Sequence, residues 1–278
     1  ILKDLVCPFC HTSLAINDEV VYCQKCQLVY PQAENAILFT SIPENIMPSE
    51  ARERGVGKDT TWRQANTDFL RTQLQKLSKE CLILDVGAGR GDFLPYYGEF
   101  PHILLDVYPY PPVDIVCDLS QLIPLRDSCL DIVLLMNVLE HVPSPLYLLC
   151  SIRSLLKSHG KVFITIPFYL KIHQAPLDFQ RLTHFALRNL AEKAGYSICF
   201  LEGFYDPVGV IQESLRYYQF WGMEGSGRLK RTFERGVLGG MQFFSKMLGK
   251  ATKRSYLKDP FQAAYPAPIG YHLVLEKN

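Results

Sequence analysis

The 278-residue chain lacks several features that would place it in a broad class at once. It has no excess of charge, since 29 Lys and Arg residues face 28 Asp and Glu residues. A near-neutral chain is not a general polyanion binder, so any contact with a nucleic acid or a membrane must depend on a local patch. No apolar run approaches the roughly 20 residues that span a bilayer, so we expect no transmembrane span. Internal repeats and low-complexity tracts are also absent.

The nine cysteines do not indicate a disulfide framework. Four are clustered near the N-terminus, and the other five stand singly in apolar runs. An odd total with isolated cysteines is typical of a reducing compartment, where such residues are small buried hydrophobes. No signal-peptide pattern precedes the first cysteine pair. We therefore expect a cytoplasmic protein, either in solution or peripheral to a membrane.

The clustered cysteines have the spacing of a metal site. Cys7, Cys10, Cys23 and Cys26 form the pattern C-x2-C-x12-C-x2-C. Each pair can place two thiolates on one side of a tight turn, and four thiolates close a tetrahedral site typical of structural Zn²⁺. Two disulfides conflict with the expected compartment, and a rubredoxin-like iron site lacks its usual aromatic-rich surroundings. We predict a structural zinc ion in a zinc ribbon that spans residues 1–42.

The rest of the chain divides into a linker and one large domain. Residues 43–80 begin with prolines and a polar stretch, and apolar residues at helical spacing then predict a lead-in helix. From residue 81, apolar runs alternate with helical patterns, which predicts an α/β fold with a doubly wound sheet covered on both faces. Strands are predicted at 81–86, 102–106, 114–117, 131–136, 161–166, 197–201 and 272–276, and helices at 146–157 and 184–194.

The most specific motif of the large domain is a glycine loop after its first strand. It follows Asp85 and reads Gly87-Ala88-Gly89-Arg90-Gly91. Glycines allow a sharp turn and the close approach of a ligand, and a helix opening beyond them would favour an anionic group. Asp92 stands where the dinucleotide fingerprint requires a third spaced glycine, so a dinucleotide is disfavoured. Asp106 closes the next strand, where a carboxylate can accept hydrogen bonds from a ribose diol.

This G-x-G-x-G spacing, with Asp85 two residues before it, resembles motif I of the class I S-adenosylmethionine (SAM)-dependent methyltransferases. The resemblance covers about residues 81–203 and the final strand. It implies an enzyme that uses SAM, with a Rossmann-like seven-stranded sheet whose last strand is antiparallel, in a domain of residues 81–278 with an insertion at about 204–268. It also implies these cofactor-binding residues: Asp85, Gly87, Ala88, Gly89, Gly91, Asp106, Val107, Asp118, Leu119 and Asn137.

Within that set, Asp118 and Leu119 follow the third strand, where the family places an adenine contact. The alternative for Asp118 is a turn residue before Ser120. The exit of the fourth strand, from Asn137 to His141, resembles the type 11 branch, which includes many small-molecule and lipid- or glycan-linked methyltransferases.

His141 is the candidate catalytic residue, because histidine can accept a proton near neutral pH. A capping or packing role is its alternative. Arg181 could bind an anionic substrate group or form a structural salt bridge. The candidate substrate residues are Glu140, Tyr169, His173, Arg181 and His184.

The segments around Val29-Tyr30-Pro31 and Ile37-Leu38-Phe39 resemble the small zinc-ribbon activator subunit of tRNA and protein methyltransferases, here fused in the same chain. Residues 228–254 hold eight Lys or Arg residues and one acid. Apolar residues recur there at helical spacing. A cap helix with a solvated face, a membrane-surface helix and an RNA-backbone patch are the open interpretations.

Three functions follow from these patterns. The first is methylation of a small-molecule or lipid- or glycan-linked acceptor. The second is rRNA or tRNA methylation guided by the zinc ribbon, and the third is a non-catalytic scaffold that binds a partner. The intact glycine loop with Asp85 and Asp106 argues against the scaffold. The acceptor itself is not identified, because the sequence has no Asn-Pro-Pro-Tyr-type motif and no evident catalytic cysteine.

Overall fold

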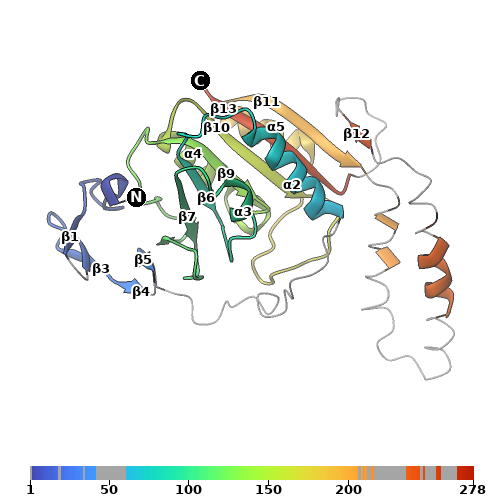
Figure 1. Ribbon diagram of the computed structural model, residues 1–278, viewed down its shortest axis with the longest axis horizontal. Coiled ribbons are helices and arrows are strands. Elements are labelled where there is room, and N and C mark those ends of the chain that lie inside the picture. Colours follow the sequence, from blue (N-terminus) through green and yellow to red (C-terminus); the bar gives the residue numbers. More distant parts are fainter. Residues whose placement is uncertain are drawn as a thin grey trace.

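A ten-stranded sheet forms the centre of the computed structural model (Figure 1). The described residues are 2–17, 20–33, 35–41, 61–205, 208, 210, 211, 214, 215, 236–244, 247, 255–257 and 268–278. The strand order is β12-β11-β13-β10-β9-β6-β7-β8-β5-β4. The seven strands that correspond to the predicted sheet are β6 (Ile83–Val86), β7 (His102–Asp106), β8 (Ile115–Val116), β9 (Leu130–Met136), β10 (Leu156–Pro167), β11 (Tyr196–Tyr205) and β13 (Gly270–Lys277).

These seven strands confirm the predicted fold class. Strands β6 to β10 run parallel to one another, and β13 lies between β10 and β11 and is antiparallel to both. The sequence segments that form them are continuous apolar runs, because each central strand is covered on both faces. In β6, all four residues are buried.

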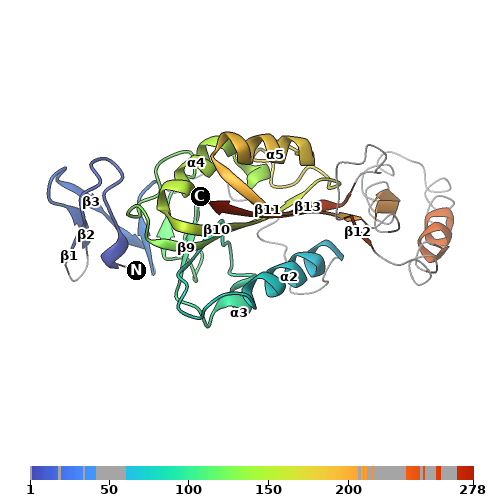
Figure 2. The ribbon, with the colours of Figure 1, turned by 90° about the horizontal axis from the view of Figure 1, so that it is seen from above.

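Helices cover the two faces of the sheet in pairs. Figure 2 shows α2 (Thr61–Leu74) and α3 (Leu94–Tyr97) on one face, and α4 (Pro145–Leu155) and α5 (His184–Lys193) on the other. The hydroxyl of Thr183 accepts a hydrogen bond from the Ala186 amide and caps α5, as its sequence position predicts. Gly195 ends this helix region in a left-handed conformation.

Two local details differ from the sequence expectation. The helix that follows the glycine loop has four residues, because Gly98 and Pro101 leave little chain before β7. The strand predicted at 161–166 begins earlier in the structure, as β10, which starts directly after α4 and has a register irregularity between Leu156 and Lys161.

The N-terminal residues form a small sheet of their own and then join the large one. Strands β1 (Ala15–Asn17), β2 (Val20–Cys23) and β3 (Leu28–Tyr30) are antiparallel, after a short 3-10 helix η1 (Leu2–Asp4). Strands β4 (Gln32–Ala33) and β5 (Ala36–Leu38) belong to the large sheet, where β5 pairs in parallel with β8. The proposed ribbon segment 1–42 therefore also supplies two edge strands, which cover the otherwise open edge of β8.

The N-terminal unit is fixed to the loop between β8 and β9. The Val6 amide donates to the Pro124 carbonyl, and the Arg126 guanidinium forms an ion pair with Asp4 at 2.5 Å. Leu5 and Leu125 are buried beside these contacts and form an isolated bridge. The buried core consequently runs without interruption from the cysteine cluster into the large sheet.

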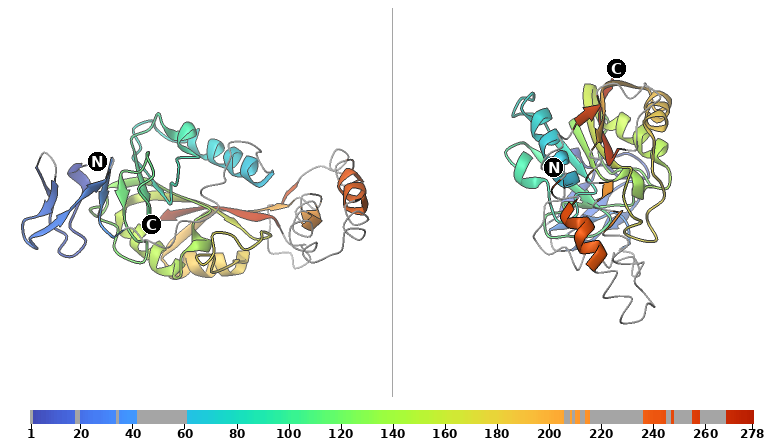
Figure 3. Two further views of the ribbon diagram at one scale, coloured as in Figure 1. Left: turned by 90° about the horizontal axis from the view of Figure 1, so that it is seen from below. Right: turned by 90° about the vertical axis from the view of Figure 1, so that its right-hand side faces the viewer.

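The insertion at 204–268 is described only in part. It contains β12 (Ser255–Leu257) and a helical segment of residues 236–244. All eight basic residues of the 228–254 segment lie outside the described residues. Figure 3 places the 236–244 helix and the N-terminal unit at opposite ends of the molecule. Among the described residues, no helix combines the length and apolarity that crossing a membrane requires.

Candidate functional site

The glycine loop lies at the C-terminal end of β6 and has a strained backbone that only glycine tolerates well. Gly87, Gly89 and Gly91 have φ values of +69°, +56° and +76°. A Cβ on Gly87 would lie 2.8 Å from a methyl group of Val138, so that position requires glycine for space as well. A Cβ on Gly89 would meet no atom within 4 Å. The backbone at Gly89 is therefore open to the approach of a ligand.

Asp106, at the end of β7, holds this loop in place. One of its carboxylate oxygens accepts a hydrogen bond from the Gly89 amide at 2.8 Å, and the other accepts one from the Tyr108 amide at 3.1 Å. Burial raises the pKa of Asp106, while these backbone donors act in the opposite direction. The carboxylate is thus brought beside the open glycine, as the sequence predicts for a ribose contact. The adjoining Val107 is partly exposed at the same strand end.

Asp85 has a partner that the sequence does not reveal. Its carboxylate is buried and accepts a hydrogen bond from the Tyr97 hydroxyl at 2.5 Å. Burial raises the pKa of Asp85 to about 7. The pair joins β6 to α3, so in this structure Asp85 supports the loop from beneath. Ala88, the residue inside the loop, is also buried.

Asp118 and Leu119 lie just beyond the C-terminal end of β8. One carboxylate oxygen of Asp118 accepts a hydrogen bond from the Ser120 amide at 2.8 Å, which is the turn geometry expected under the alternative interpretation. Both residues are partly exposed at the edge where ligands bind in open α/β sheets. Their contact with adenine stays a prediction.

Asn137 follows β9 with a φ of +58° and is held by the lead-in helix. Its side-chain oxygen accepts hydrogen bonds from the Trp62 indole at 3.0 Å and from the Asn66 amide at 3.4 Å. Helix α2 thus contributes two side chains to this edge of the sheet. The sequence pattern predicts only a lead-in helix here. The signal for a site contact is Trp62, an indole in the otherwise polar first turn of α2.

Asn66 continues this network to a buried histidine. Its side-chain oxygen lies 2.9 Å from Nε2 of His272 in β13. The imidazole is stacked between Trp62 and Phe69, with ring centroids 5.1 and 4.8 Å away. Burial lowers the pKa of His272 to about 3, so the ring is neutral. Sequence reasoning missed His272 because a histidine inside an apolar strand looks like an ordinary core residue.

Glu140 and His141 form a short 3-10 helix η2 (Leu139–His141) after Asn137. Nδ1 of His141 lies 2.6 Å from the Leu177 carbonyl, and its Nε2 lies 3.8 Å from a Glu140 oxygen. Burial lowers the pKa of His141 to about 4 and raises that of Glu140 to about 8. A histidine with such a low pKa is a weaker base than an ordinary one, and its role as a general base stays a prediction.

The remaining substrate candidates divide into two groups. His173 lies beside His141, with ring centroids 4.6 Å apart. Arg181 forms a bidentate ion pair with Asp178 at 2.5 and 2.8 Å, so the salt bridge considered for it is present. Tyr169 and His184 lie outside this group. The Tyr169 hydroxyl lies 2.6 Å from the Ser214 hydroxyl, and Nδ1 of His184 lies 3.4 Å from the Tyr271 hydroxyl.

The four N-terminal cysteines converge on one point. The Sγ atoms of Cys7 and Cys26 are 3.9 Å apart, and those of Cys10 and Cys23 are 3.5 Å apart. Thiolates on a tetrahedral zinc ion would be about 3.8 Å apart, from a Zn–S bond of about 2.3 Å. Hydrogen bonds from the Thr12 hydroxyl, with the larger effect, and from the Cys26 amide lower the pKa of Cys23 and favour its thiolate. The donors and their spacing fit a four-thiolate metal site.

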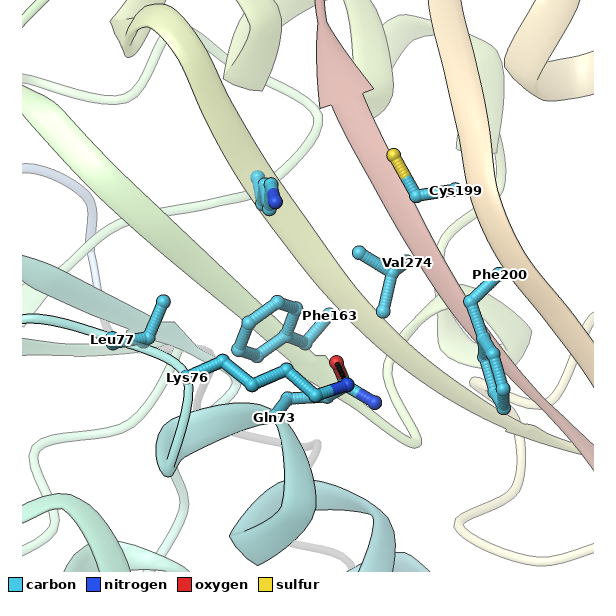
Figure 4. A pocket seen from close by; sticks show the side chains of 8 residues that line it. Gln73, Lys76, Leu77, Phe163, Cys199, Phe200 and Val274 are labelled. Atoms are coloured by element: carbon cyan, nitrogen blue, oxygen red, sulfur yellow. Dashed lines mark hydrogen bonds between the residues drawn. The ribbon is translucent and has the colours of Figure 1, made fainter.

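A cavity of about 200 Å³ lies elsewhere, between the end of α2 and the sheet (Figure 4). Its walls include Phe163, Phe200 and Val274, with Lys76 at the rim. Lys161, another lining residue, starts the paired part of β10, whereas the glycine loop and Asn137 are at C-terminal strand ends. None of the predicted site residues lines this cavity. It is therefore separate from the candidate site.

Comparison with known proteins identifies the large domain. The family described as methyltransferase domain matches residues 60–199, half of the chain. An uncharacterised protein of Methanocaldococcus jannaschii is 35% identical over 95 residues, which is 32% of this chain. The matched part spans 41% of that relative's length.

Two solved structures align with the chain at low sequence identity. A Galdieria sulphuraria protein, proposed to be a sarcosine dimethylglycine methyltransferase, aligns with a TM-score of 0.49 and 15% identity, over 78% of this chain and 86% of that one. A SAM-dependent methyltransferase from Archaeoglobus fulgidus aligns with a TM-score of 0.45 and 17% identity, over 77% of this chain and 94% of that one.

Proposed function

The chain belongs to the methyltransferase domain family, and we propose that it is a SAM-dependent methyltransferase whose acceptor is a small molecule or a lipid- or glycan-linked compound. The observation that carries SAM binding at the glycine loop is the open backbone at Gly89, held by the buried carboxylate of Asp106. The resemblance of the Asn137–His141 exit to the type 11 branch supports the acceptor class.

The residues around the loop have distinct tasks in this proposal. SAM, when bound, supplies a methyl group that its sulfonium already activates. The Gly87–Gly91 backbone accommodates the methionine part, and the remaining lone pairs of Asp106 accept hydrogen bonds from the ribose hydroxyls. Asp118 and Leu119 bind the adenine. Trp62 and Asn66 hold Asn137 at the strand end, so that α2 stabilises the edge where cofactor and acceptor meet.

Catalysis then depends mainly on alignment of the acceptor atom with the methyl group. A general base is needed only when the acceptor is a hydroxyl or a protonated amine. His141 is the first candidate for this general base. Tyr169, His173 and His184 are the further candidates. The buried surroundings of His141 keep its imidazole neutral at physiological pH, which is the protonation state of a base.

We also propose that Cys7, Cys10, Cys23 and Cys26 bind a structural zinc ion. All four ligand positions are filled by protein thiolates, so no position remains for a substrate. The metal would stabilise the β1–β3 sheet and the contact of Leu5 with Leu125.

Calorimetric titration of the zinc-loaded protein with SAM tests the cofactor site. We expect a micromolar dissociation constant, about −8 kcal/mol, that weakens at least tenfold in Asp106→Ala. The matched control is Asp127→Ala, which removes an exposed carboxylate from a turn and should bind SAM like the wild type. Absence of binding by the wild type would contradict SAM binding at this site.

Transfer of a labelled methyl group tests the acceptor class. The zinc-loaded protein would be incubated with labelled SAM and, in parallel, with a lipid and glycolipid extract, a small-metabolite fraction, and total rRNA and tRNA. We expect label in the lipid or metabolite fractions. Label confined to RNA would overturn the proposed acceptor and favour the function guided by the zinc ribbon.

One observation favours a membrane-associated acceptor within this class. In the 236–244 helix and at residue 247, large apolar side chains are exposed, among them Phe243 at 67% and Phe244 at 62%. The helix is anchored by Leu238, which packs on Leu215. Exposed apolar side chains in a sequence segment rich in Lys and Arg are suited to a membrane surface.

A further inference from the structure

Three potential metal ligands meet beside the proposed active site. They are Glu140 and His141 of η2, and His173 of the loop between β10 and α5. One ligand atom from each residue lies within 4.8 Å of the other two. The loop folds over η2, because Gln180 donates to the Leu139 and Val142 carbonyls and Phe179 donates to the Glu140 carbonyl. This packing encloses the three side chains.

Glu140 has an environment that ordinary packing does not explain. Its side chain is completely buried, and within the described part of the chain neither carboxylate oxygen has a hydrogen-bond partner. Nε2 of His141 is also buried without a hydrogen-bond partner there. Buried carboxylates are normally paired, hydrogen-bonded or bound to a metal, because an isolated buried charge is strongly unfavourable. Both unpartnered groups point into the same cluster, 3.8 Å apart.

The hydrogen bonds of the two histidines leave the correct nitrogen for a metal. Nδ1 of His141 faces the Leu177 carbonyl at 2.6 Å, and a carbonyl can only accept, so this nitrogen carries the proton. Nδ1 of His173 lies 3.2 Å from an Asp178 oxygen and 3.3 Å from the Lys171 carbonyl, which are both acceptors; Arg181 Nη2, which can only donate, is farther away at 3.5 Å. When Nδ1 donates to the nearer acceptors, Nε2 keeps its lone pair, as where a carboxylate or carbonyl orients a metal-binding histidine.

We propose that Glu140, His141 and His173 bind a divalent transition-metal ion. One carboxylate and two neutral imidazoles suit Zn²⁺, Mn²⁺ or Fe²⁺ better than Mg²⁺ or Ca²⁺, which prefer oxygen ligands. Metal bonds of about 2.1 Å place tetrahedral ligands about 3.4 Å apart. The ligand atoms of the three residues now lie within 4.8 Å of one another. Small side-chain rotations would bring them to the shorter metal-bound separation. The positive ion would supply the partner that Glu140 lacks.

Three protein ligands leave coordination positions open, which distinguishes this site from the closed four-cysteine site. An acceptor hydroxyl bound at an open position would lose its proton more easily than in water. In metal-loaded protein, His141 would be a ligand and no longer the general base, and the released proton would pass to water. This consequence rests on the proposed methyltransferase function and would direct the enzyme towards oxygen acceptors. The metal site itself does not depend on it.

Mn²⁺ binding tests the site without interference from the cysteines. Mn²⁺ favours oxygen and nitrogen over thiolate ligands, and in protein loaded with a single equivalent of Zn²⁺ per chain the four cysteines hold that zinc ion. Free Mn²⁺ is followed by electron paramagnetic resonance during titration of the full chain. We expect one saturable site per chain, weakened at least tenfold in both Glu140→Gln and His173→Asn. The control His159→Asn removes an exposed imidazole of β10 and should bind Mn²⁺ as the wild type does.

Thermal unfolding gives a second readout that does not depend on catalysis. Mn²⁺ should raise the melting temperature of the wild type and of His159→Asn, and leave that of Glu140→Gln unchanged. Glu140→Gln keeps the side-chain volume and removes a buried charge, so it should fold. Lack of saturable binding by the wild type, or equal binding by Glu140→Gln, would overturn the proposal. SAM titration of the same proteins separates this failure from a failure of the cofactor site.

Discussion

At the scale of single residues, the glycines of the site differ in what they require. Gly87 lacks space for a Cβ, whereas Gly89 has open space and needs glycine only for its positive φ. A left-handed conformation costs about 1–2 kcal/mol in a residue with a Cβ. Substitutions at the two positions therefore separate the stability of the fold from access of the ligand.

We predict that Gly89→Ala lowers SAM affinity at least tenfold and destabilises the fold by only about 1–2 kcal/mol. The added methyl group would project into the space that the cofactor backbone contact needs. The control is Gly195→Ala, which has a φ of +78° and lies after α5. It should show a similar loss of stability in urea and normal SAM binding in calorimetry. Normal SAM binding by Gly89→Ala would remove the loop from the cofactor site.

His272 predicts a dependence of stability on acid pH. Its folded pKa, about 3, is below the unfolded value of 6.5, so the unfolded chain binds the proton first as the pH falls. The contribution of a neutral His272 is thus complete above pH 6.5 and declines by roughly 1.4 kcal/mol per pH unit towards pH 3. Glu140 acts in the opposite direction, because its raised pKa disfavours the folded state as pH rises from 4.5 towards 8.

Comparison with a variant isolates the histidine. Between pH 6.5 and 5, the wild type should lose about 2 kcal/mol more unfolding free energy than His272→Gln, whose amide can keep the contact with Asn66. Urea denaturation at several pH values measures this difference, and the contribution of Glu140 cancels in it. Parallel curves for the two proteins would show that His272 is not kept neutral by burial.

At the scale of elements, the 236–244 helix is the part whose surface is least explained by the fold. One side chain, Leu238, is buried, while Phe243 and Phe244 project from the helix with more than half of their surface exposed. A globular protein has little reason to expose neighbouring aromatic side chains on one short helix. The exposed surface is the basis of the proposed membrane contact.

We predict that the double variant Phe243→Ser/Phe244→Ser binds vesicles of neutral and anionic phospholipid at least tenfold more weakly than the wild type. The loss of two apolar side chains from the interface, about 1.5–3 kcal/mol each when fully buried, accounts for this effect. Vesicle sedimentation provides the measurement. Phe9→Ser, an exposed phenylalanine of the N-terminal unit, serves as the control. Equal sedimentation of all three proteins would exclude this helix as a membrane anchor.

At the scale of the whole molecule, the cysteine cluster and the catalytic sheet form one core. Cys7, Val21 and Tyr30 belong to the same buried cluster as Ile115 of β8, and β5 extends the large sheet. Loss of the proposed zinc ion should therefore weaken the large domain as well as the N-terminal unit. The methyltransferase sheet would lose the cover of its β8 edge, next to Asp118.

We predict that Cys23→Ser lowers the melting temperature on the order of 10 °C, because a structural zinc ion contributes several kcal/mol to folding. Zinc content by elemental analysis should fall in the same variant. Cys150→Ser, which changes an exposed cysteine of α4, should alter neither quantity. A zinc-free wild type with unchanged melting temperature would contradict a structural metal at this site.

The sequence by itself determined the elements whose signals are local. Continuous apolar runs marked the strands, the helical pattern of residues 184–194 marked α5, and the glycine spacing after β6 marked the loop. Such signals are carried by neighbouring residues, because strand burial, helix capping and positive φ are properties of short segments. The family resemblance added the antiparallel last strand, which the pairing of β13 confirms.

Only the tertiary structure decided which distant side chains meet. Tyr97 on Asp85, Trp62 on Asn137, and His173 beside Glu140 each join residues from different elements, and no local pattern encodes such a contact. The same holds for β4 and β5, which look like part of the N-terminal unit and pair with the large sheet instead. Burial also lowers the pKa of His141, because the loop that encloses it comes from more than 30 residues downstream. These contacts depend on the packing of the complete fold, which fixes the environment of each side chain.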